Sequence, residues 1–172
     1  MISEEVSPNN QDAWEFPWGR GNFSTKKVYL GISGSQPDPI PFKWIWKSPR
    51  LPKHKIFFWL TIQDILITKD LMARKNFCVE SLDCVLCEDS TRETRMHLFF
   101  GCEFSHDFWS RLGDVWNYDP PFMDMLLDTK QRSNNQFFKI ALIAGCWSLW
   151  THKNKIIFEN EQRGLKICFN YF

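Results

Sequence analysis

Hydrophobic and polar residues follow the period of an α-helix through much of this chain. Between residues 53 and 67, apolar side chains recur at the spacing of one helix face. The longest such segment spans residues 136–160, where Trp147, Trp150, Asn154 and Ile157 fall on one stripe. A further helix is predicted over residues 104–116. Since few segments read as strands, the pattern predicts a mainly α fold.

Turn-forming and polar residues separate these predicted helices. Residues 31–41 contain three prolines and two glycines and are predicted to form a loop. Ser24 and Thr68 are suited to cap helices that begin directly after them, and the second helix is expected to run to Arg74. Residues 83–89 show no period, so we expect a loop there as well.

Length and aromatic content indicate one substantial core. The 172 residues are enough for a single domain, and they include 9 Trp and 16 Phe, which favours a large aromatic interior. We expect a disordered polar leader over residues 1–11, a domain over 12–118, and a trailing helical segment over 119–172 packed on the same core. No apolar run reaches the about 18 residues that a membrane-spanning helix needs, so no membrane contact is expected.

Four potential metal ligands occur in the pattern Cys84-x2-Cys87-x9-His97-x4-Cys102. Thiolate and imidazole are ligands that suit Zn²⁺, and four of them complete a tetrahedral shell without a position for water. The ligand order is that of a zinc knuckle, although the middle gap is longer. The pattern therefore predicts a knuckle-like loop that holds one structural Zn²⁺.

Disulfide bonds are the main alternative, because the number of cysteines is even. The six are Cys78, Cys84, Cys87, Cys102, Cys146 and Cys168. Residues 1–16 lack the basic start and apolar core of a secretory signal, so we expect an intracellular protein, nuclear or cytoplasmic and not secreted. Thiols stay reduced in such compartments, which favours metal binding. A redox pair at Cys84 and Cys87 would need a surrounding strand–helix alternation that the sequence lacks.

The spacing of His97 and Cys102 poses a geometric problem. Five residues along an α-helix rotate about 140° away from a common face, so a continuous helix would direct the two side chains apart. Gly101 can end or bend the helix and so relax this conflict. Alternatively, His106 replaces one ligand, since Cys102 and His106 are four residues apart and share a helix face.

Further elements accompany the four residues in a fixed order. They are Trp44-Ile45-Trp46-Lys47, Pro52-Lys53-His54-Lys55-Ile56-Phe57-Phe58-Trp59-Leu60, Thr68-Lys69-Asp70-Leu71, Glu93-Thr94-x2-His97-Leu98-Phe99-Phe100-x-Cys102, Trp109, and Trp147-x2-Trp150-x2-Lys153-Asn154-x3-Phe158. Over residues 12–160 this order closely resembles the zinc-binding domain of plant LINE-type (non-LTR) reverse transcriptases, with lysine at 153 in place of the family's arginine. The resemblance implies Cys84, Cys87, His97 and Cys102 as the zinc ligands. It leaves the other three cysteines as core thiols.

The chain lacks the residues of the polymerase itself. The Tyr/Phe-x-Asp-Asp signature is absent, and the 20 acidic residues form no cluster suited to two metal ions. We therefore expect a non-catalytic zinc-binding module derived from a retrotransposon reverse transcriptase, with no small-molecule substrate.

A basic and aromatic segment suggests a partner for this module. Residues 39–63 contain five cations and no acidic residue, and the cations are Lys43, Lys47, Arg50, Lys53 and Lys55. Phe42, Trp44 and Trp46 lie among them, so the segment is suited to RNA or DNA. With a net charge of +1, such binding should be weak and salt-dependent. The alternative is that the rings are core, in a purely structural or protein-interaction domain, or a non-functional remnant, that zinc stabilises.

Overall fold

The computed structural model describes residues 24–34 and 40–172 and divides the chain into two units, Met1–Asp38 and Pro39–Phe172. The predicted leader lies outside the described residues. In the first unit, α1 (Thr25–Ser33) begins after Ser24, as predicted. The Ser24 carbonyl accepts a hydrogen bond from the Val28 N–H at 3.0 Å, but its side chain makes no capping bond.

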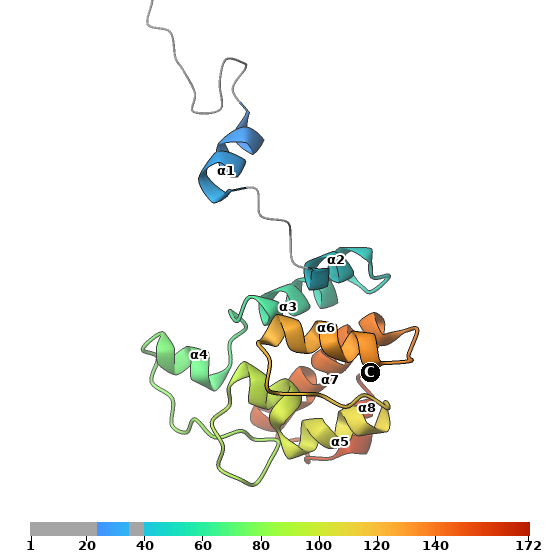
Figure 1. The fold of residues 1–172 in the computed structure, drawn as a ribbon. Helices are drawn as coiled ribbons and strands as arrows, with labels where there is room; N and C mark the ends of the chain where they lie inside the picture. The colour runs from blue at the N-terminus through green and yellow to red at the C-terminus, as the bar shows by residue number, and fades with distance from the viewer. Residues whose placement is uncertain (1–23, 35–39) are drawn as a thin grey trace, which may run out of the picture. The chain divides into compact units, whose positions relative to one another are not determined.

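The described part of the second unit consists of helices (Figure 1). They are α2 (Ile40–Lys47), α3 (Pro52–Ile62), α4 (Lys69–Arg74), a π-helical turn η1 (His97–Gly101), α5 (Glu103–Arg111), α6 (Phe122–Arg132), α7 (Phe138–Glu159) and α8 (Leu165–Phe169). Within the described residues, β pairing is limited to one antiparallel bridge between Asp83 and Arg92. The mainly α fold is therefore confirmed.

Helix α3 is shorter than the predicted segment 53–67. It ends at Ile62, and Asp64 follows in the left-handed conformation with φ 56°. The N–H of Ile65 then bonds to the Leu60 carbonyl at 3.1 Å, which is the 6→1 hydrogen bond of a Schellman motif. The prediction was wrong here because aspartate rather than glycine takes the left-handed position.

The helix predicted over residues 104–116 also ends early, at Arg111. Gly113 takes a left-handed φ of 79°, and the N–H of Asp114 bonds back to the Trp109 carbonyl at 3.1 Å. Gly113 was a visible stop signal, because glycine is the preferred residue after a helix end. The apolar period nevertheless extended the predicted helix past this glycine. Trp116 lies in the loop that follows α5.

The loop predicted over residues 31–41 was too long at both ends. Helix α1 continues to Ser33, and α2 already begins at Ile40. Proline is compatible with the first turn of a helix, so Pro41 does not prevent α2. Helices α6 and α8 were not predicted individually, although residues 119–172 were expected to be helical. Thr68 caps α4 as expected, through a bond from the Leu71 N–H at 3.2 Å.

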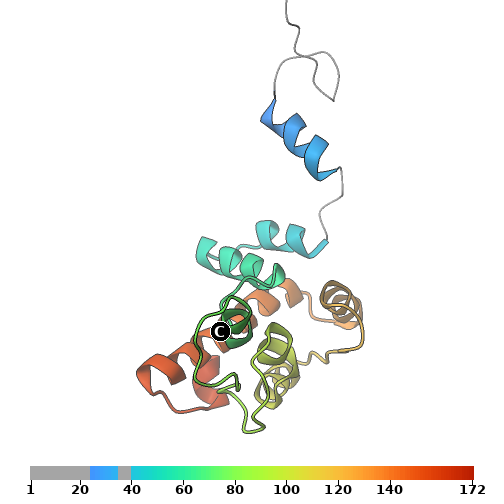
Figure 2. The ribbon, with the colours of Figure 1, turned by 90° about the vertical axis from the view of Figure 1, so that its left-hand side faces the viewer.

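The core forms around α7, the longest helix. Helices α3 and α8 and the turn η1 all pack against it, while α2 and α3 lie side by side in both views (Figures 1 and 2). The ring of Phe57 in α3 meets Trp147 edge-on at 5.3 Å and Phe99 of η1 at 6.1 Å between centroids. The predicted aromatic interior is thus shared by helices on both sides of residue 118. Among the described residues, no helix combines the length and apolarity needed to cross a membrane.

Candidate metal centre

An antiparallel bridge between two short segments positions the first two cysteines. The N–H of Cys84 bonds to the Thr91 carbonyl and the N–H of Glu93 bonds to the Leu82 carbonyl, each at 2.8 Å. These two bonds flank the bridge between Asp83 and Arg92 and close the loop that carries Cys87. Both cysteines are buried, with exposed fractions of 4% and 9%.

The second pair lies on the segment that follows. Thr94 begins it by accepting a hydrogen bond from the His97 N–H on its side-chain oxygen at 3.1 Å, as an N-cap residue does. The N–H of Cys102 then bonds to the His97 carbonyl at 2.7 Å, which is the i→i+5 bond of a π-helix. Because this wider turn takes about five residues, His97 and Cys102 return to the same side.

The wide turn, rather than the flexibility of glycine, resolves the predicted conflict between these two residues. A Cβ added at Gly101 would lie 3.7 Å from the nearest backbone oxygen, and Gly101 has no left-handed φ. No steric reason therefore requires glycine at this position.

Side chains that follow in the sequence hold the π-turn in place. The carbonyls of Leu98, Phe99 and Phe100 accept hydrogen bonds from Ser105, Trp109 and Tyr118, in that order, at 2.5, 2.6 and 2.7 Å. Leu98, Phe99 and Phe100 are themselves fully buried. Since an unpaired buried carbonyl is costly, these three donors stabilise a turn that would otherwise be unfavourable.

The four donor atoms converge at distances suited to one metal ion. They all lie within 4.8 Å of one another. The sulfurs of Cys84 and Cys102 are 4.0 Å apart, and the Cys87 sulfur lies 3.3 Å from the Nε2 of His97. A tetrahedral zinc with the usual bond lengths places two sulfurs about 3.8 Å apart and a sulfur and a nitrogen about 3.6 Å apart. Cys84, Cys87, His97 and Cys102 are thus positioned to bind a metal.

Hydrogen bonding and burial set the protonation of these groups. The bond that Cys84 donates to Cys102 raises the pKa of the Cys84 thiol and lowers that of Cys102. Burial raises the pKa of Cys87, and it lowers the pKa of His97 so that the imidazole is mainly neutral at pH 7. A neutral imidazole offers the lone pair that a metal needs, whereas the Cys84 and Cys87 thiols, with their raised pKa values, must lose protons on binding.

Cys102 also benefits from its place at the start of α5. It is the N-cap residue of this nine-residue helix. The backbone N–H groups of Ser105 and Phe104 lie close to the sulfur and act with the bond from Cys84 in lowering the pKa of the Cys102 thiol, although no side-chain cap bond forms. A helix N-terminus favours a thiolate, so this sulfur carries negative charge most readily.

The remaining histidine and cysteine candidates lie elsewhere. His106 is not part of the cluster, and its side chain is 58% exposed beside Asp107. Cys146 and Cys168 are buried in the core, as predicted. The prediction for Cys78 was wrong, because this residue is exposed on the loop after α4.

The five predicted nucleic-acid residues occupy α2, α3 and the turn between them. Lys43, Lys47 and Lys53 are exposed, whereas Arg50 and Lys55 are partly buried. The Lys53 ammonium lies 5.2 Å from the centre of the Trp147 ring, and the Lys55 ammonium donates to the Trp46 carbonyl at 3.5 Å.

The aromatic residues among these cations divide between core and surface. Trp44 is a core residue with 6% exposure, in agreement with the alternative drawn from the sequence, and Phe42 and Trp59 are partly buried against the same core. Trp46 is different, since 61% of it is exposed. Trp46 follows Lys43 by three residues and Lys47 follows it by four, so the three side chains share the solvent face of α2.

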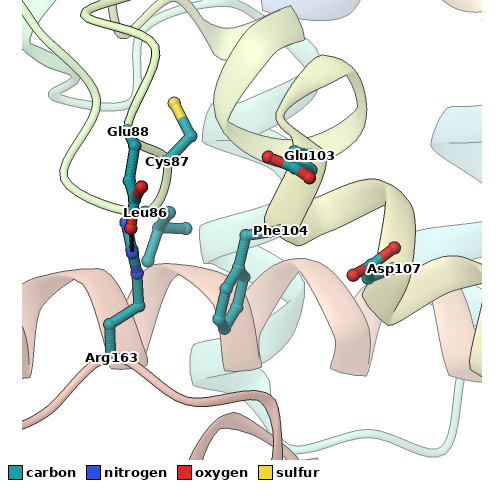
Figure 3. Close-up of a pocket in the computed structure, with 7 residues that line it drawn as sticks. All are labelled: Leu86, Cys87, Glu88, Glu103, Phe104, Asp107 and Arg163. Atoms are coloured by element: carbon teal, nitrogen blue, oxygen red, sulfur yellow. Dashed lines mark hydrogen bonds and ion pairs between the residues drawn. The ribbon is translucent and has the colours of Figure 1, made fainter.

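An acidic cavity of about 300 Å³ lies beside the metal centre (Figure 3). Glu103, Phe104 and Asp107 of α5 face Glu88 and Arg163, which form an ion pair across the cavity from them. The carboxylates make this side of the domain unfavourable for phosphate groups.

Residues 23–109 match the family described as zinc-binding in reverse transcriptase, and this range contains all four clustered residues. The chain belongs to this family. No match was found among curated proteins or among solved structures. Residues beyond 109, including the tryptophans of α7, lie outside the matched range.

Proposed function

We propose that this protein is a non-catalytic module in which Cys84, Cys87, His97 and Cys102 hold one structural Zn²⁺. The observation that supports this most directly is the convergence of three thiols and one imidazole within 4.8 Å. Sulfur-rich tetrahedral sets favour zinc over the hard cations magnesium and calcium. Four protein ligands fill the shell, so the ion would have no open position to activate water.

Zinc stoichiometry tests this proposal. Native mass spectrometry on protein purified without chelator should find one zinc per chain. Cys102→Ser should lose the zinc, and Cys78→Ser should keep it because Cys78 is exposed and outside the cluster. A folded parent protein without zinc, or a Cys102→Ser variant with full zinc, would contradict the ligand assignment.

We further propose that the α2–α3 side contacts single-stranded RNA or DNA. The specific support is Trp46, a large exposed ring between the exposed cations Lys43 and Lys47. A ring can stack on an unpaired base while lysines neutralise the flanking phosphates. The alternative is a purely structural or protein-interaction role, in which Trp46 binds no nucleic acid.

A charge-matched pair of variants separates these two roles. One variant replaces Lys43, Lys47, Lys53 and Lys55 by glutamine and leaves Arg50, whose Nε is buried. The control replaces the exposed lysines 26, 27, 75 and 166 by glutamine. Fluorescence anisotropy with a labelled oligonucleotide should show loss of binding only in the first variant. Equal loss in both would indicate nonspecific attraction, and no binding by the parent would leave the structural role.

We also propose which group of reverse transcriptases this module comes from and in which cell compartment it lies. The trailing Trp147-x2-Trp150-x2-Lys153-Asn154 pattern on α7 resembles plant LINE-type elements, and we assign the module to that group of reverse transcriptases. The four clustered donors include three free thiols, which fits a reducing intracellular compartment, nuclear or cytoplasmic.

A further inference from the structure

A second basic and aromatic feature lies at the end of α2. A cavity of about 180 Å³ opens between the end of α2, the turn at Ser48 and Pro49, and the residues that begin α7. Its lining includes the lysines Lys47 and Lys139 and the ring of Phe137, and it contains no carboxylate. The volume is below the roughly 300–1,000 Å³ of pockets for drug-sized ligands, so it suits a single flat ring or one phosphate.

The core holds this cavity in shape. The ring of Trp44 forms part of its wall and packs edge-on against the buried Phe138, with 6.2 Å between the centroids. The Lys139 ammonium lies 5.6 Å from the centre of the Trp44 ring. This contact between a cation and an aromatic face holds the ammonium at the cavity. This side of the cavity is therefore formed by a core ring and carries positive charge.

The outer groups of the cavity are free to meet a ligand. Phe137 is 58% exposed, although its neighbour Phe138 is buried. Among the residues that the structure describes, neither Lys47 nor Lys139 has a carboxylate within 4.0 Å. Two unpaired cations beside an exposed ring are the combination that binds phosphate and stacks on a base.

We propose that this cavity is a subsite for one nucleotide of a single-stranded nucleic acid, with its base on Phe137 and its phosphate between Lys47 and Lys139. The inference rests on the proposed nucleic-acid contact and extends it from α2 to the start of α7. Single strands are favoured over duplexes because only unpaired bases expose a face for stacking. An acidic peptide would satisfy the cations but would leave the ring without a stacking partner.

Two variants outside the α2–α3 cation set test the subsite. They are Phe137→Leu, which removes the stacking ring, and Lys139→Gln, which removes one cation. Matched controls are Phe158→Leu, whose ring is 78% exposed at the other end of α7, and Lys166→Gln on α8. The zinc-loaded full chain would be titrated into labelled oligothymidylate of about 16 nucleotides, the upper end of common single-domain site sizes. A duplex of equal length and a polyglutamate peptide serve as competitors.

The expected outcome is specific to these positions. Phe137→Leu should weaken binding by about fivefold or more, and Lys139→Gln should reduce the slope of log affinity against log salt by about 0.7. Both controls should bind like the parent. If the parent binds but both test variants match it, the subsite is wrong and the contact at α2–α3 stands. Stronger competition by the duplex or the peptide would overturn the single-strand assignment. If the parent binds no oligonucleotide, the proposed contact and this inference both fail.

Discussion

The ammonium of Lys153 lies 3.1 Å from Oε1 of Glu93, and both side chains are almost completely buried, with exposed fractions of 6% and 0%. Glu93 directly precedes the capped turn that carries His97, whereas Lys153 belongs to α7. The same carboxylate oxygen accepts the N–H of Lys69 at 3.1 Å, at the start of α4. One carboxylate oxygen therefore connects the segment that carries His97 to α7 through an ion pair and to α4 through a hydrogen bond.

Removing the cation of this pair should destabilise the protein strongly. Lys153→Met would leave the Glu93 carboxylate buried without a counter-ion, at a cost of about 3–5 kcal/mol in the free energy of unfolding. Urea unfolding of the zinc-loaded protein measures this value. The double variant Glu93→Gln/Lys153→Met should recover much of the loss, because no charge remains buried and the glutamine oxygen can still accept from Lys69.

A second lysine on the same helix provides the control for this experiment. Lys155 pairs with Glu159 at 3.4 Å on the surface of α7. Lys155→Met should change the stability little, since solvent screens exposed pairs. If Lys153→Met and Glu93→Gln/Lys153→Met had equal free energies of unfolding, the buried pair would not form.

Loss of one metal ligand should unfold more than its own loop. Structural zinc contributes about 10–16 kcal/mol in finger peptides, comparable with the about 5–15 kcal/mol that stabilises a whole domain. Cys87→Ser should therefore lower both zinc occupancy and melting temperature, and chelation of the parent should reproduce that melting temperature. Cys146→Ser should lower only the melting temperature, because Cys146 is a buried core thiol. A Cys87→Ser protein that retains zinc and melts like the parent would refute the site.

Metal binding should weaken as the pH falls. In the metal-free protein the raised pKa values of Cys84 and Cys87 keep both thiols protonated at neutral pH. Binding must displace these protons, and protonation of His97 adds competition at lower pH. Zinc release to a colorimetric chelator should increase between about pH 8 and pH 4, a range that includes the usual histidine pKa. Calorimetry in buffers of different ionisation enthalpy should detect proton release on binding, and its absence would contradict the thiol assignment.

Helix α7 should tolerate no side chain at Gly145. A Cβ at this position would come within 2.9 Å of the Phe108 ring and closer still to Trp109, whose indole holds the π-turn. We expect Gly145→Ala to destabilise the protein by about 1–3 kcal/mol through overpacking, measured by urea unfolding. Gly101→Ala is the matched control and should be nearly neutral, because its Cβ would meet only ordinary contacts. If Gly101→Ala destabilised the protein more than Gly145→Ala, the steric requirement for glycine would lie in the π-turn instead.

Features that depend on residues close together in the sequence could be predicted. The cysteine and histidine spacing indicated the four residues that converge, and Thr68 was recognised as a cap because its partner is only three residues away. The helical period located α3, α5 and α7, although not their ends. Where an end was signalled by a less typical residue, as at Asp64, the prediction extended too far.

Relations between distant segments were decided by the tertiary structure. The sequence by itself determined the mainly α class, the family and the candidate ligands, since spacing and period are local properties. Only packing decided that Trp44 is buried while Trp46 is exposed, and that Lys153 meets Glu93. It also decided that a π-turn, held by three later side chains, directs His97 and Cys102 to one point. These outcomes depend on which surfaces meet in three dimensions, and no local pattern records that.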